Sequence, residues 1–393
     1  MRHVFSAAAA VLSFVVLSGC GEVSTTPPPV PSISTSATPS VEPGLFAVLV
    51  SHNAQDPKDH DEAAIVGPDG SVQAQASFTP RPSGSPAVCG AAPWLMPEAY
   101  VAAGAVFFVD ASGVIRRLQP DGTVTKVASL KFDPHSQLLS FVVSPDGNLI
   151  MATILTIPAS TTTVPGAGCG TFSGNWTLDT YLVTAGTSSA DQVNHQEAPP
   201  DSGLASSAPG FKNVLLLGWD SGGPIGEVGA DYAVQSSVYP DAIVSGGQLT
   251  RLDTFGKAGD ELGGSGCTPL AAPVGDRVAC TQSAGPAQLS VRTLEGKVLW
   301  TGTPAQVGAC CLAGGALSPD GTQFATTGRL VQVSSGSAQD LPADFSPVGW
   351  TDATTIVGHA GSPTGALGIL RTGGPGTVTS LNNLMGTYAG RLS

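Results

Sequence analysis

The chain contains the stretch Val143-Ser144-Pro145-Asp146-Gly147-Asn148-Leu149-Ile150, in which a polar turn separates two apolar runs. A proline presets the backbone angle of the second turn position, an aspartate bonds to the local backbone, and a glycine accepts a positive φ. The flanking residues, 138–143 and 149–154, are mostly strand-forming apolar residues. The stretch therefore predicts the tip of a β-hairpin.

The same x-Pro-Asp-Gly turn occurs at residues 67–70, 119–122, 144–147 and 318–321. The first two turns are about 50 residues apart, which is the length of one four-stranded blade. The second and third are about 25 apart, as expected if one set of turns closes the outer strand pair of a blade and the other closes the inner pair of the next. The spacing predicts a repeated all-β architecture.

Weaker turns extend the outer-pair series to seven members, adding to residues 67 and 119 the positions Ala185-Gly186, Gly246-Gly247, Thr293–Gly296, Gly336 and Gly373-Gly374. Residues 45–393 then hold seven units of about 50 residues each, with no persuasive helical periodicity. We therefore expect a seven-bladed β-propeller, with six or eight blades as alternatives.

Two of the turn regions, Val143–Ile150 and Leu317–Phe324, resemble the WD40-like repeat of TolB-type propellers. Residues 106–118 look like the outer half of such a blade. The Gly-His and Trp-Asp dipeptides of ordinary WD40 repeats do not recur as a repeat signature, since each occurs only once in the sequence, at Gly358-His359 and Trp219-Asp220. The resemblance implies a propeller of an interaction family that is associated with the cell envelope.

The first unit has sequence for three strands only, at residues 45–50, 63–66 and 72–77. The last unit is complete before Asn382, which leaves residues 387–392 spare. We expect this C-terminal segment to close the ring as the missing strand of the first blade, because an open edge would promote aggregation.

The N-terminus begins with Arg2 and His3, continues with an apolar run over residues 4–16, and ends in Leu17-Ser18-Gly19-Cys20. This pattern is typical of a secretory signal. Its ending resembles the lipobox of bacterial lipoproteins, which implies that residues 1–19 are removed and that Cys20 carries the lipid. The alternative is an ordinary secretion signal in which Cys20 is incidental.

Residues 20–44 follow as a Ser-, Thr- and Pro-rich segment that offers nothing to bury in a core. We expect a disordered, lipidated tether ahead of the propeller domain of residues 45–393. Pro28-Pro29-Val30-Pro31 also matches a P-x-x-P ligand pattern, although a spacer needs no partner.

Composition excludes two broad classes of protein. Hydrophobic residues make up 41% of the chain and charged residues 11%, which excludes a solvated disordered polymer. The net charge of −13 argues against nucleic-acid binding, because such a surface repels phosphates. After the first twenty residues no apolar run is long enough for a transmembrane helix.

Six cysteines remain besides Cys20, an even number that suggests disulfides in an exported protein. On the propeller interpretation some of them precede first strands and others follow second strands, and these two kinds of loop share one face. We expect a Cys89–Cys169 bond. The other four cysteines form a second, local cluster: Cys267, Cys280, Cys310 and Cys311. Within it a vicinal Cys310–Cys311 bond is one possibility, and a zinc site made by the four is the alternative.

Motifs for chemistry are sparse. Weak candidates for metal ligands share one loop, where a solvated turn is the plainer interpretation: His52, Asp56, Asp59 and His60. The other histidines, His135, His195 and His359, are isolated in the sequence, and a Ser-His-Asp set assembled across blades stays open. No cofactor-binding motif occurs, so no cofactor is expected.

The five tryptophans are interpreted as blade-packing residues rather than a ligand cage. Trp219 and Trp350 end predicted inner strands, which would place them near the central channel. Asn175-Trp176-Thr177 fits a glycosylation sequon that we interpret as chance.

These observations predict a membrane-anchored extracytoplasmic lipoprotein whose propeller is a binding platform for another envelope component. The membrane would be reached through the lipid on Cys20, and an enzymatic role is not favoured. The alternatives are a propeller hydrolase and a small-ligand receptor at the cell surface. Neither the partner nor the oligomeric state follows from the sequence.

Overall fold

The computed structural model divides the chain into two compact units, Met1–Pro39 and Ser40–Ser393. The residues that the structure describes all belong to the second unit, and they are 44–50, 61–82, 98–158, 174–187, 189–198, 215–228, 248–282, 288–302, 315–361, 365–374, 376–381 and 384–392. The predicted signal segment, Cys20 and nearly all of the tether therefore lie outside the described residues.

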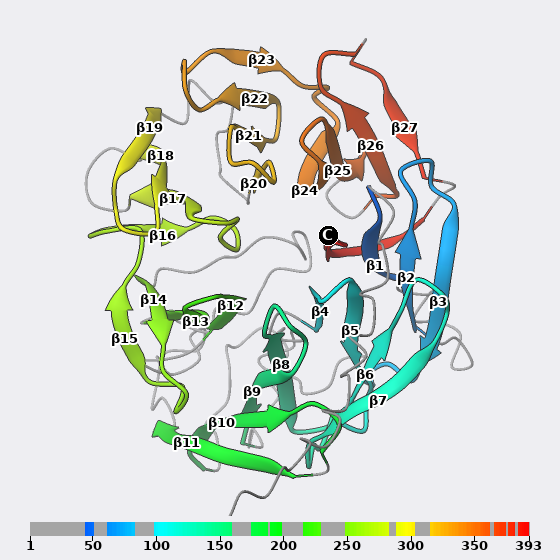
Figure 1. The fold of residues 1–393 in the computed structure, drawn as a ribbon, viewed down its shortest axis with the longest axis vertical. Coiled ribbons are helices and arrows are strands. Elements are labelled where there is room, and N and C mark those ends of the chain that lie inside the picture. Colours follow the sequence, from blue (N-terminus) through cyan, green and yellow to red (C-terminus); the bar gives the residue numbers. More distant parts are fainter. Residues whose placement is uncertain are drawn as a thin grey trace, which may run out of the picture. The chain divides into compact units, whose positions relative to one another are not determined.

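The described residues form 28 β-strands in seven four-stranded antiparallel sheets, arranged as the blades of a propeller (Figure 1). From the innermost strand outward, blades I to IV are β28 (Gly386–Arg391), β1 (Phe46–Val50), β2 (Asp61–Val66), β3 (Val72–Phe78); β4 (Ala99–Ala102), β5 (Ala105–Val109), β6 (Val114–Leu118), β7 (Val124–Ser129); β8 (Gln137–Val143), β9 (Leu149–Thr156), β10 (Trp176–Thr184), β11 (Ala190–Ala198); and β12 (Leu215–Asp220), β13 (Gly223–Val228), β14 (Gln248–Leu252), β15 (Ala258–Glu261).

Blades V to VII complete the ring with β16 (Thr268–Pro269), β17 (Arg277–Gln282), β18 (Gln288–Thr293), β19 (Val298–Gly302); β20 (Ala316–Leu317), β21 (Gln323–Thr326), β22 (Arg329–Gln332), β23 (Ala338–Asp340); and β24 (Phe345–Asp352), β25 (Thr355–Ala360), β26 (Leu367–Arg371), β27 (Val378–Ser380). The prediction of an all-β propeller with seven blades is confirmed. Among the described residues no helix is long and apolar enough to cross a membrane.

The hairpin turn that identified the fold has the predicted structure. Between β8 and β9, the Ser144 N–H donates to the Leu149 carbonyl at 2.8 Å, and the Gly147 N–H donates to the Ser144 carbonyl at 2.8 Å. The Asp146 carboxylate accepts the Ser144 hydroxyl at 2.5 Å, and Gly147 has φ +75°. Asp and Gly therefore satisfy the backbone of a turn that few other residue pairs could form.

The two sets of turns fall where the spacing placed them. Turns 67–70 and 119–122 join the outer strand pairs of blades I and II, and turns 144–147 and 318–321 join the inner pairs of blades III and VI.

One turn assignment was wrong. The outer pair of blade IV, β14 and β15, is joined by Asp253–Lys257 and not by Gly246-Gly247, which lies before β14 and outside the described residues. The Asp253 carboxylate accepts the N–H groups of Phe255 at 2.8 Å and Lys257 at 2.9 Å, and Gly256 has φ +66°. An Asp and a Gly thus form this turn without the proline on which the motif search relied.

The C-terminal strand closes the ring as predicted. β28 pairs antiparallel with β1, from Phe46 opposite Arg391 to Val50 opposite Gly386, and is the innermost strand of blade I. Just beyond the strand, the Leu392 N–H donates to the Leu45 carbonyl at 2.8 Å. The first blade therefore takes one strand from the end of the chain and three from its beginning.

The hydrophobic core consists of seven clusters, and each lies between two neighbouring blades. In β8, Leu138 and Val142 pack toward blade IV, whereas Leu139, Phe141 and Val143 pack toward blade II. Because both faces of β8 are buried, this strand is a nearly continuous apolar run instead of an alternating one.

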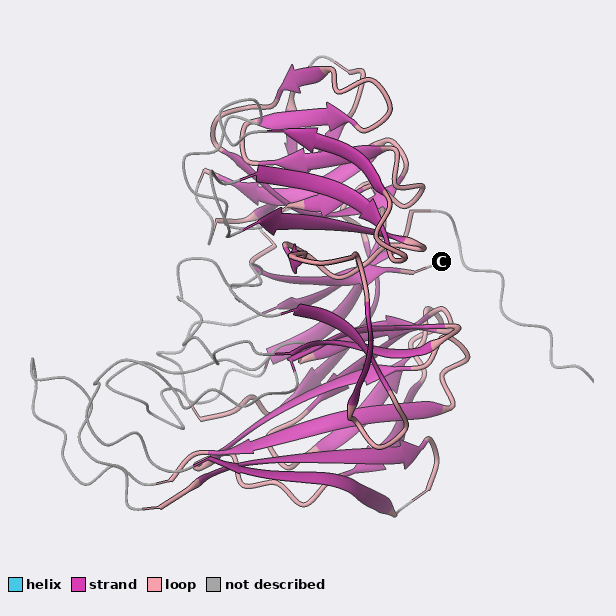
Figure 2. Cartoon of the chain, turned by 90° about the vertical axis from the view of Figure 1, so that its left-hand side faces the viewer, coloured by secondary structure: helices cyan, strands magenta, loops and turns pink. Residues whose placement is uncertain are grey.

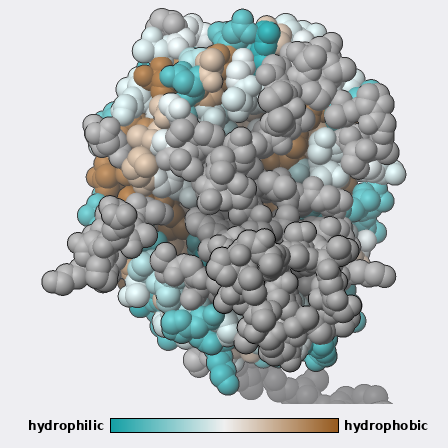
Figure 3. All heavy atoms as spheres, turned by 180° about the vertical axis from the view of Figure 1, so that it is seen from behind, coloured by the Kyte–Doolittle hydropathy of each residue, from teal (hydrophilic) through white to brown (hydrophobic). Residues whose placement is uncertain are grey.

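Short turns lie along one face of the ring (Figure 2). We call "turn face" the end at which short turns join the third and fourth strands of each blade and the first and second strands of blades II to VII. In blade I the first and second strands, β28 and β1, come from opposite ends of the chain. We call "loop face" the opposite end, which Figure 3 shows. The longer connections all leave from the loop face: residues 51–60, 79–98, 157–175, 199–214, 229–247 and 303–315.

Candidate functional site

Trp219 and Trp350, which the sequence placed near the channel, lie on innermost strands, but both pack against the cores between blades. Trp350 in β24 is 2% exposed, and its indole N–H donates to the Ala316 carbonyl of blade VI at 3.0 Å. Trp219 in β12 packs against the cluster between blades III and IV. Trp176, which is 1% exposed, belongs to the same cluster. Trp94 lies outside the described residues.

Two half-buried tyrosines link innermost strands, and nothing in the sequence singled them out. The Trp219 backbone N–H of blade IV donates to the Tyr100 hydroxyl of blade II at 3.0 Å, and burial raises the pKa of Tyr100 to about 12. The Tyr388 hydroxyl of β28 donates to the Trp350 carbonyl at 2.7 Å, and burial raises its pKa as well. These contacts brace the centre of the ring.

Among the described residues, an open groove of about 700 Å³ lies between the outer parts of blades V and VI. We call it the V–VI groove. One wall is β19, with Val298 and Trp300, and the other is formed by β22, by Ala338 of β23 and by the turn 333–336. Val331 and Val333 on that second wall are buried and belong to the core cluster between the two blades.

Trp300 is the aromatic side chain of the V–VI groove. It packs against the interblade core, and a Cβ added at Gly302 would overlap its ring. A Cβ at Gly336, which has φ +68°, would lie 3.2 Å from the indole Nε1. The two glycines therefore leave room for the ring, and no described residue accepts a hydrogen bond from its N–H.

The V–VI groove is nearly uncharged. Its one charged lining residue, Arg329 of β22, pairs across the sheet with Asp340 of β23 at 2.5 Å. The remaining polar groups of the lining are hydroxyls and backbone, such as Thr301, Ser334 and Ser335. Polar groups therefore make up more of its exposed lining than apolar groups do, and the half-buried ring of Trp300 supplies an aromatic contact.

A second polar constellation lies on the outer strands of blade III. His195 of β11 stands opposite Asp179 of β10, with Nδ1 2.6 Å from Oδ1, and its Nε2 is 3.2 Å from Oε1 of Glu197. The hydrogen bond to Asp179, and then the one to Glu197, raise the pKa of His195. The two carboxylates lie at opposite ring nitrogens, so they favour the protonated form of the imidazole and do not converge on a common ligand.

The three histidines that look isolated in the sequence are not brought together. His135 lies on the connection before β8, and His195 is on the exposed edge of blade III. His359 of β25 is buried, with Nδ1 2.8 Å from the Gly365 carbonyl. The Asn175 of the sequon bonds through its side chain to Glu197 at 3.2 Å. Within the described part of the chain, no three His, Cys, Asp or Glu side chains form a metal-binding group.

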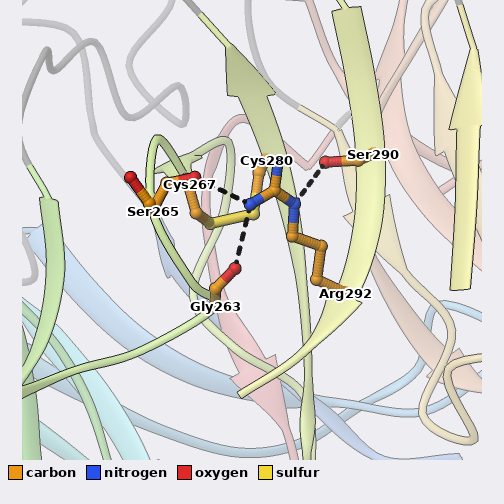
Figure 4. Close-up of a disulfide and its surroundings, with 6 residues drawn as sticks. All are labelled: Gly263, Ser265, Cys267, Cys280, Ser290 and Arg292. Atoms are coloured by element: carbon orange, nitrogen blue, oxygen red, sulfur yellow. Dashed lines mark hydrogen bonds between the residues drawn. A yellow bond between two sulfur atoms is a disulfide. The ribbon is translucent and has the colours of Figure 1, made fainter. Parts of the chain in front are cut away.

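A disulfide joins Cys267 to Cys280 in blade V, with a Cα–Cα distance of 5.0 Å (Figure 4). The prediction that these two residues share a local cluster is confirmed for this pair. The sequence placed Cys280 after the second strand of its blade, but Cys280 lies inside that strand, β17. Both cysteines belong to the core between blades IV and V. Cys89, Cys169, Cys310 and Cys311 lie outside the described residues.

The segment before β16 is also tied to a buried arginine (Figure 4). The Arg292 guanidinium donates through Nη1 to the carbonyls of Gly263 and Ser265, both at 3.1 Å, and through Nε to the Ser290 hydroxyl at 3.0 Å. Disulfide and arginine together fix the connection from blade IV to blade V, so this is a structural element.

The weak metal-ligand candidates of the sequence, His52, Asp56, Asp59 and His60, lie outside the described residues, as does Cys20. The V–VI groove, by contrast, escaped sequence reasoning. Its walls come from different blades, and Trp300 carried no signal beyond its residue type.

No protein-family model matches the chain. No curated protein matches it either. Solved structures do match, at low sequence identity. An oligogalacturonate lyase in complex with manganese is 9% identical over 77% of this chain and 80% of its own, with a TM-score of 0.45. The oligogalacturonate lyase of Vibrio parahaemolyticus is 9% identical over 84% and 91%, with a TM-score of 0.43.

The acylaminoacyl peptidase of Pyrococcus horikoshii is 12% identical over 87% of this chain, with a TM-score of 0.47. This chain covers 51% of that peptidase. At these identities the likenesses concern the fold alone.

Proposed function

We propose that the protein is a lipid-anchored, extracytoplasmic binding propeller that holds another component of the cell envelope. The observation that carries the proposal is the V–VI groove, a concave surface beside an aromatic side chain and an arginine. Tryptophan and arginine are the residue types that most often dominate binding energy at interfaces.

The propeller is suited to present such a surface without changing shape. The ring is closed by β28, its blades share seven cores, and the tyrosines Tyr100 and Tyr388 brace its inner strands. A rigid scaffold lowers the entropy lost on binding, because few groups must be ordered.

The anchor belongs to the proposal and is supported by the sequence. Leu17-Ser18-Gly19-Cys20 resembles a lipobox, and residues 21–44 would serve as spacer between the membrane and the propeller. Two or more acyl chains anchor a protein stably, whereas one alone is marginal. The negative net charge of −13 favours neutral or cationic partners over anionic polymers.

Site-specific photocrosslinking in cells tests the proposed function. A photoreactive side chain replaces Ala338, an exposed residue that lines the V–VI groove. The matched control replaces Ala258, an exposed alanine on the outermost strand of blade IV. We expect a discrete adduct from position 338, identified by mass spectrometry, and none from position 258. Equal labelling at both positions, or none, contradicts the proposal, as does turnover of a hydrolase substrate that one groove substitution abolishes.

A further inference from the structure

We infer that the V–VI groove binds an extended segment of a partner polypeptide, which adds to β19 as a fifth strand of blade V and places an apolar side chain beside Trp300. This inference rests on the proposed function and specifies its partner. Three features of the described residues support it: the free edge of β19, the aromatic ring of Trp300 in the groove, and the charge of the groove.

The first feature is the free edge of β19. This strand is the outermost of blade V, and β18 is its one partner among the described strands. An outermost strand presents unpaired backbone N–H and C=O groups on its outer side. The backbone of another extended strand can satisfy such a row, which is the basis of peptide recognition by strand addition.

The composition of β19 distinguishes it from most other outermost strands. Those of blades II, III, IV and VI each contain charged residues, as natural proteins use to protect free edges: Lys126, Asp191, Glu197, Asp260, Glu261 and Asp340. β19 reads Val-Leu-Trp-Thr-Gly and contains no charge. It joins an unprotected edge to a groove that would receive the side chains of an added strand.

The second feature is the aromatic ring of Trp300. Val331 and Val333 are 1% and 5% exposed, so they belong to the core against which Trp300 packs and leave little surface of their own to a ligand. Gly336 has no side chain to cover the Trp300 indole, and a Cβ there would come within 3.2 Å of Nε1. A bulky apolar side chain of the partner would contact the half-buried ring and would bury Val298, which is 50% exposed.

The third feature is charge. The groove carries one ion pair, Arg329 with Asp340, and is otherwise uncharged. The neighbouring outermost strands, β15 and β23, are acidic and fully exposed. Charge complementarity therefore favours a segment that is uncharged where it faces the groove and is flanked by basic residues.

A glycan is the other ligand that a half-buried tryptophan and hydroxyl groups could accept. It would use the ring and the serines of the 333–336 turn but would leave the edge of β19 unpaired. The uncharged edge favours the polypeptide, and the experiments separate the two ligands.

The test uses the full-length protein in detergent and a displayed library of random twelve-residue peptides as the probe. The blocking variant is Val298→Lys, because a lysine on a free edge opposes strand addition. Its matched control is Val72→Lys. Both valines are the first residue of an outermost strand after a turn, and they are 50% and 48% exposed. We expect enriched peptides to bind at least about tenfold more weakly to Val298→Lys and equally well to Val72→Lys.

A second pair of variants protects the test against misfolding of the first. Ala338→Trp fills the groove from an exposed position on its other wall, and Ala258→Trp is the control on blade IV. Hydrogen exchange of residues 298–302 supplies a readout specific to strand addition, since pairing must slow exchange of the β19 amides. Enrichment of no peptide, equal affinity for Val298→Lys, or unchanged exchange of β19 overturns the inference.

The two proposals fail separately. If position 338 crosslinks to a glycan in cells, the proposed binding function stands and the polypeptide inference fails. If peptides pair with β19 in vitro but position 338 captures nothing in cells, the inference stands and the proposed function fails. If two copies of the chain crosslink through position 338, the partner strand is the protein's own and the foreign partner is excluded.

Discussion

At the scale of single residues, the protonation of His195 affects the stability of the outer strand pair of blade III, β10 and β11. It is held between Asp179 and Glu197, and these bonds raise its pKa. A raised pKa in the folded state adds stability that is complete below the unfolded pKa of about 6.5 and is lost as pH rises through the folded value.

We therefore expect His195→Gln to destabilise the protein near pH 6 and to have no effect near pH 9. The side chain is 46% exposed, so the loss should not exceed about 1 kcal/mol. Urea unfolding of both proteins at the two pH values measures it. Asp179→Asn, which removes the first partner of the imidazole, should remove most of this pH dependence. If the Asp179→Asn protein kept the full pH dependence of stability, the His195–Asp179 hydrogen bond would not be its cause.

A second residue-level prediction concerns Gly349 on the innermost strand of blade VII. A Cβ there would overlap the ring of Tyr388 from β28. Gly349→Ala must push the tyrosine away, and it should lower the free energy of unfolding by about 1–3 kcal/mol, as overpacking does. Gly174→Ala is the control, because its new Cβ would meet only Pro158 at 3.9 Å. Equal stability of the two variants would show that β24 and Tyr388 can move apart without lowering the free energy of unfolding.

At the scale of elements, a covalent bond supports the short first strand of blade V. β16 has two residues, and the Cys267–Cys280 bond attaches the segment before it to β17. Replacing both cysteines by serine should cost about 2–4 kcal/mol, the usual contribution of a disulfide that closes a short loop.

Both sulfurs are buried, with Cys267 1% and Cys280 0% exposed. Reductant should therefore leave the bond intact in the native protein and cleave it in denaturant, which alkylation and intact mass would reveal. Alkylation of this pair under native conditions would contradict the buried position.

The sequence predicted those elements whose signal is local. The Ser144-Pro145-Asp146-Gly147 turn forms through contacts within a few residues, so its structure could be predicted from its composition. The Asp253–Lys257 turn was missed because it lacks the proline. The His195 pair with Asp179 escaped notice because cross-strand register, and not sequence proximity, brings the two together. The V–VI groove was missed because its two walls belong to different blades, which only the tertiary structure brings together.

At the scale of the whole molecule, the ring is held closed by one strand. β28 covers the edge of β1 and contributes Tyr388 to the core between blades VII and I. Deleting residues 386–393 would expose that edge together with Phe46, which is fully buried.

We expect this truncation to lower the melting temperature by about 10 °C or more and to promote aggregation. Thermal unfolding followed by circular dichroism and light scattering measures both effects. Deletion of Ser393 alone is the control. A truncated protein as stable as the parent would show that the ring needs no closure by β28.

The last prediction concerns where the propeller is held. If Cys20 carries lipid, the whole domain is confined to a membrane surface, and a partner need only be bound weakly because both components share that surface. We expect Cys20→Ala to abolish incorporation of labelled fatty acid and to leave the signal segment uncleaved by lipoprotein signal peptidase, with a slower mobility on gels. Cys267→Ala is the control, since it removes a cysteine of the propeller and should leave lipid labelling unchanged. Wild-type protein without lipid on Cys20 would end the anchoring proposal while leaving the V–VI groove as a binding site of an unanchored protein.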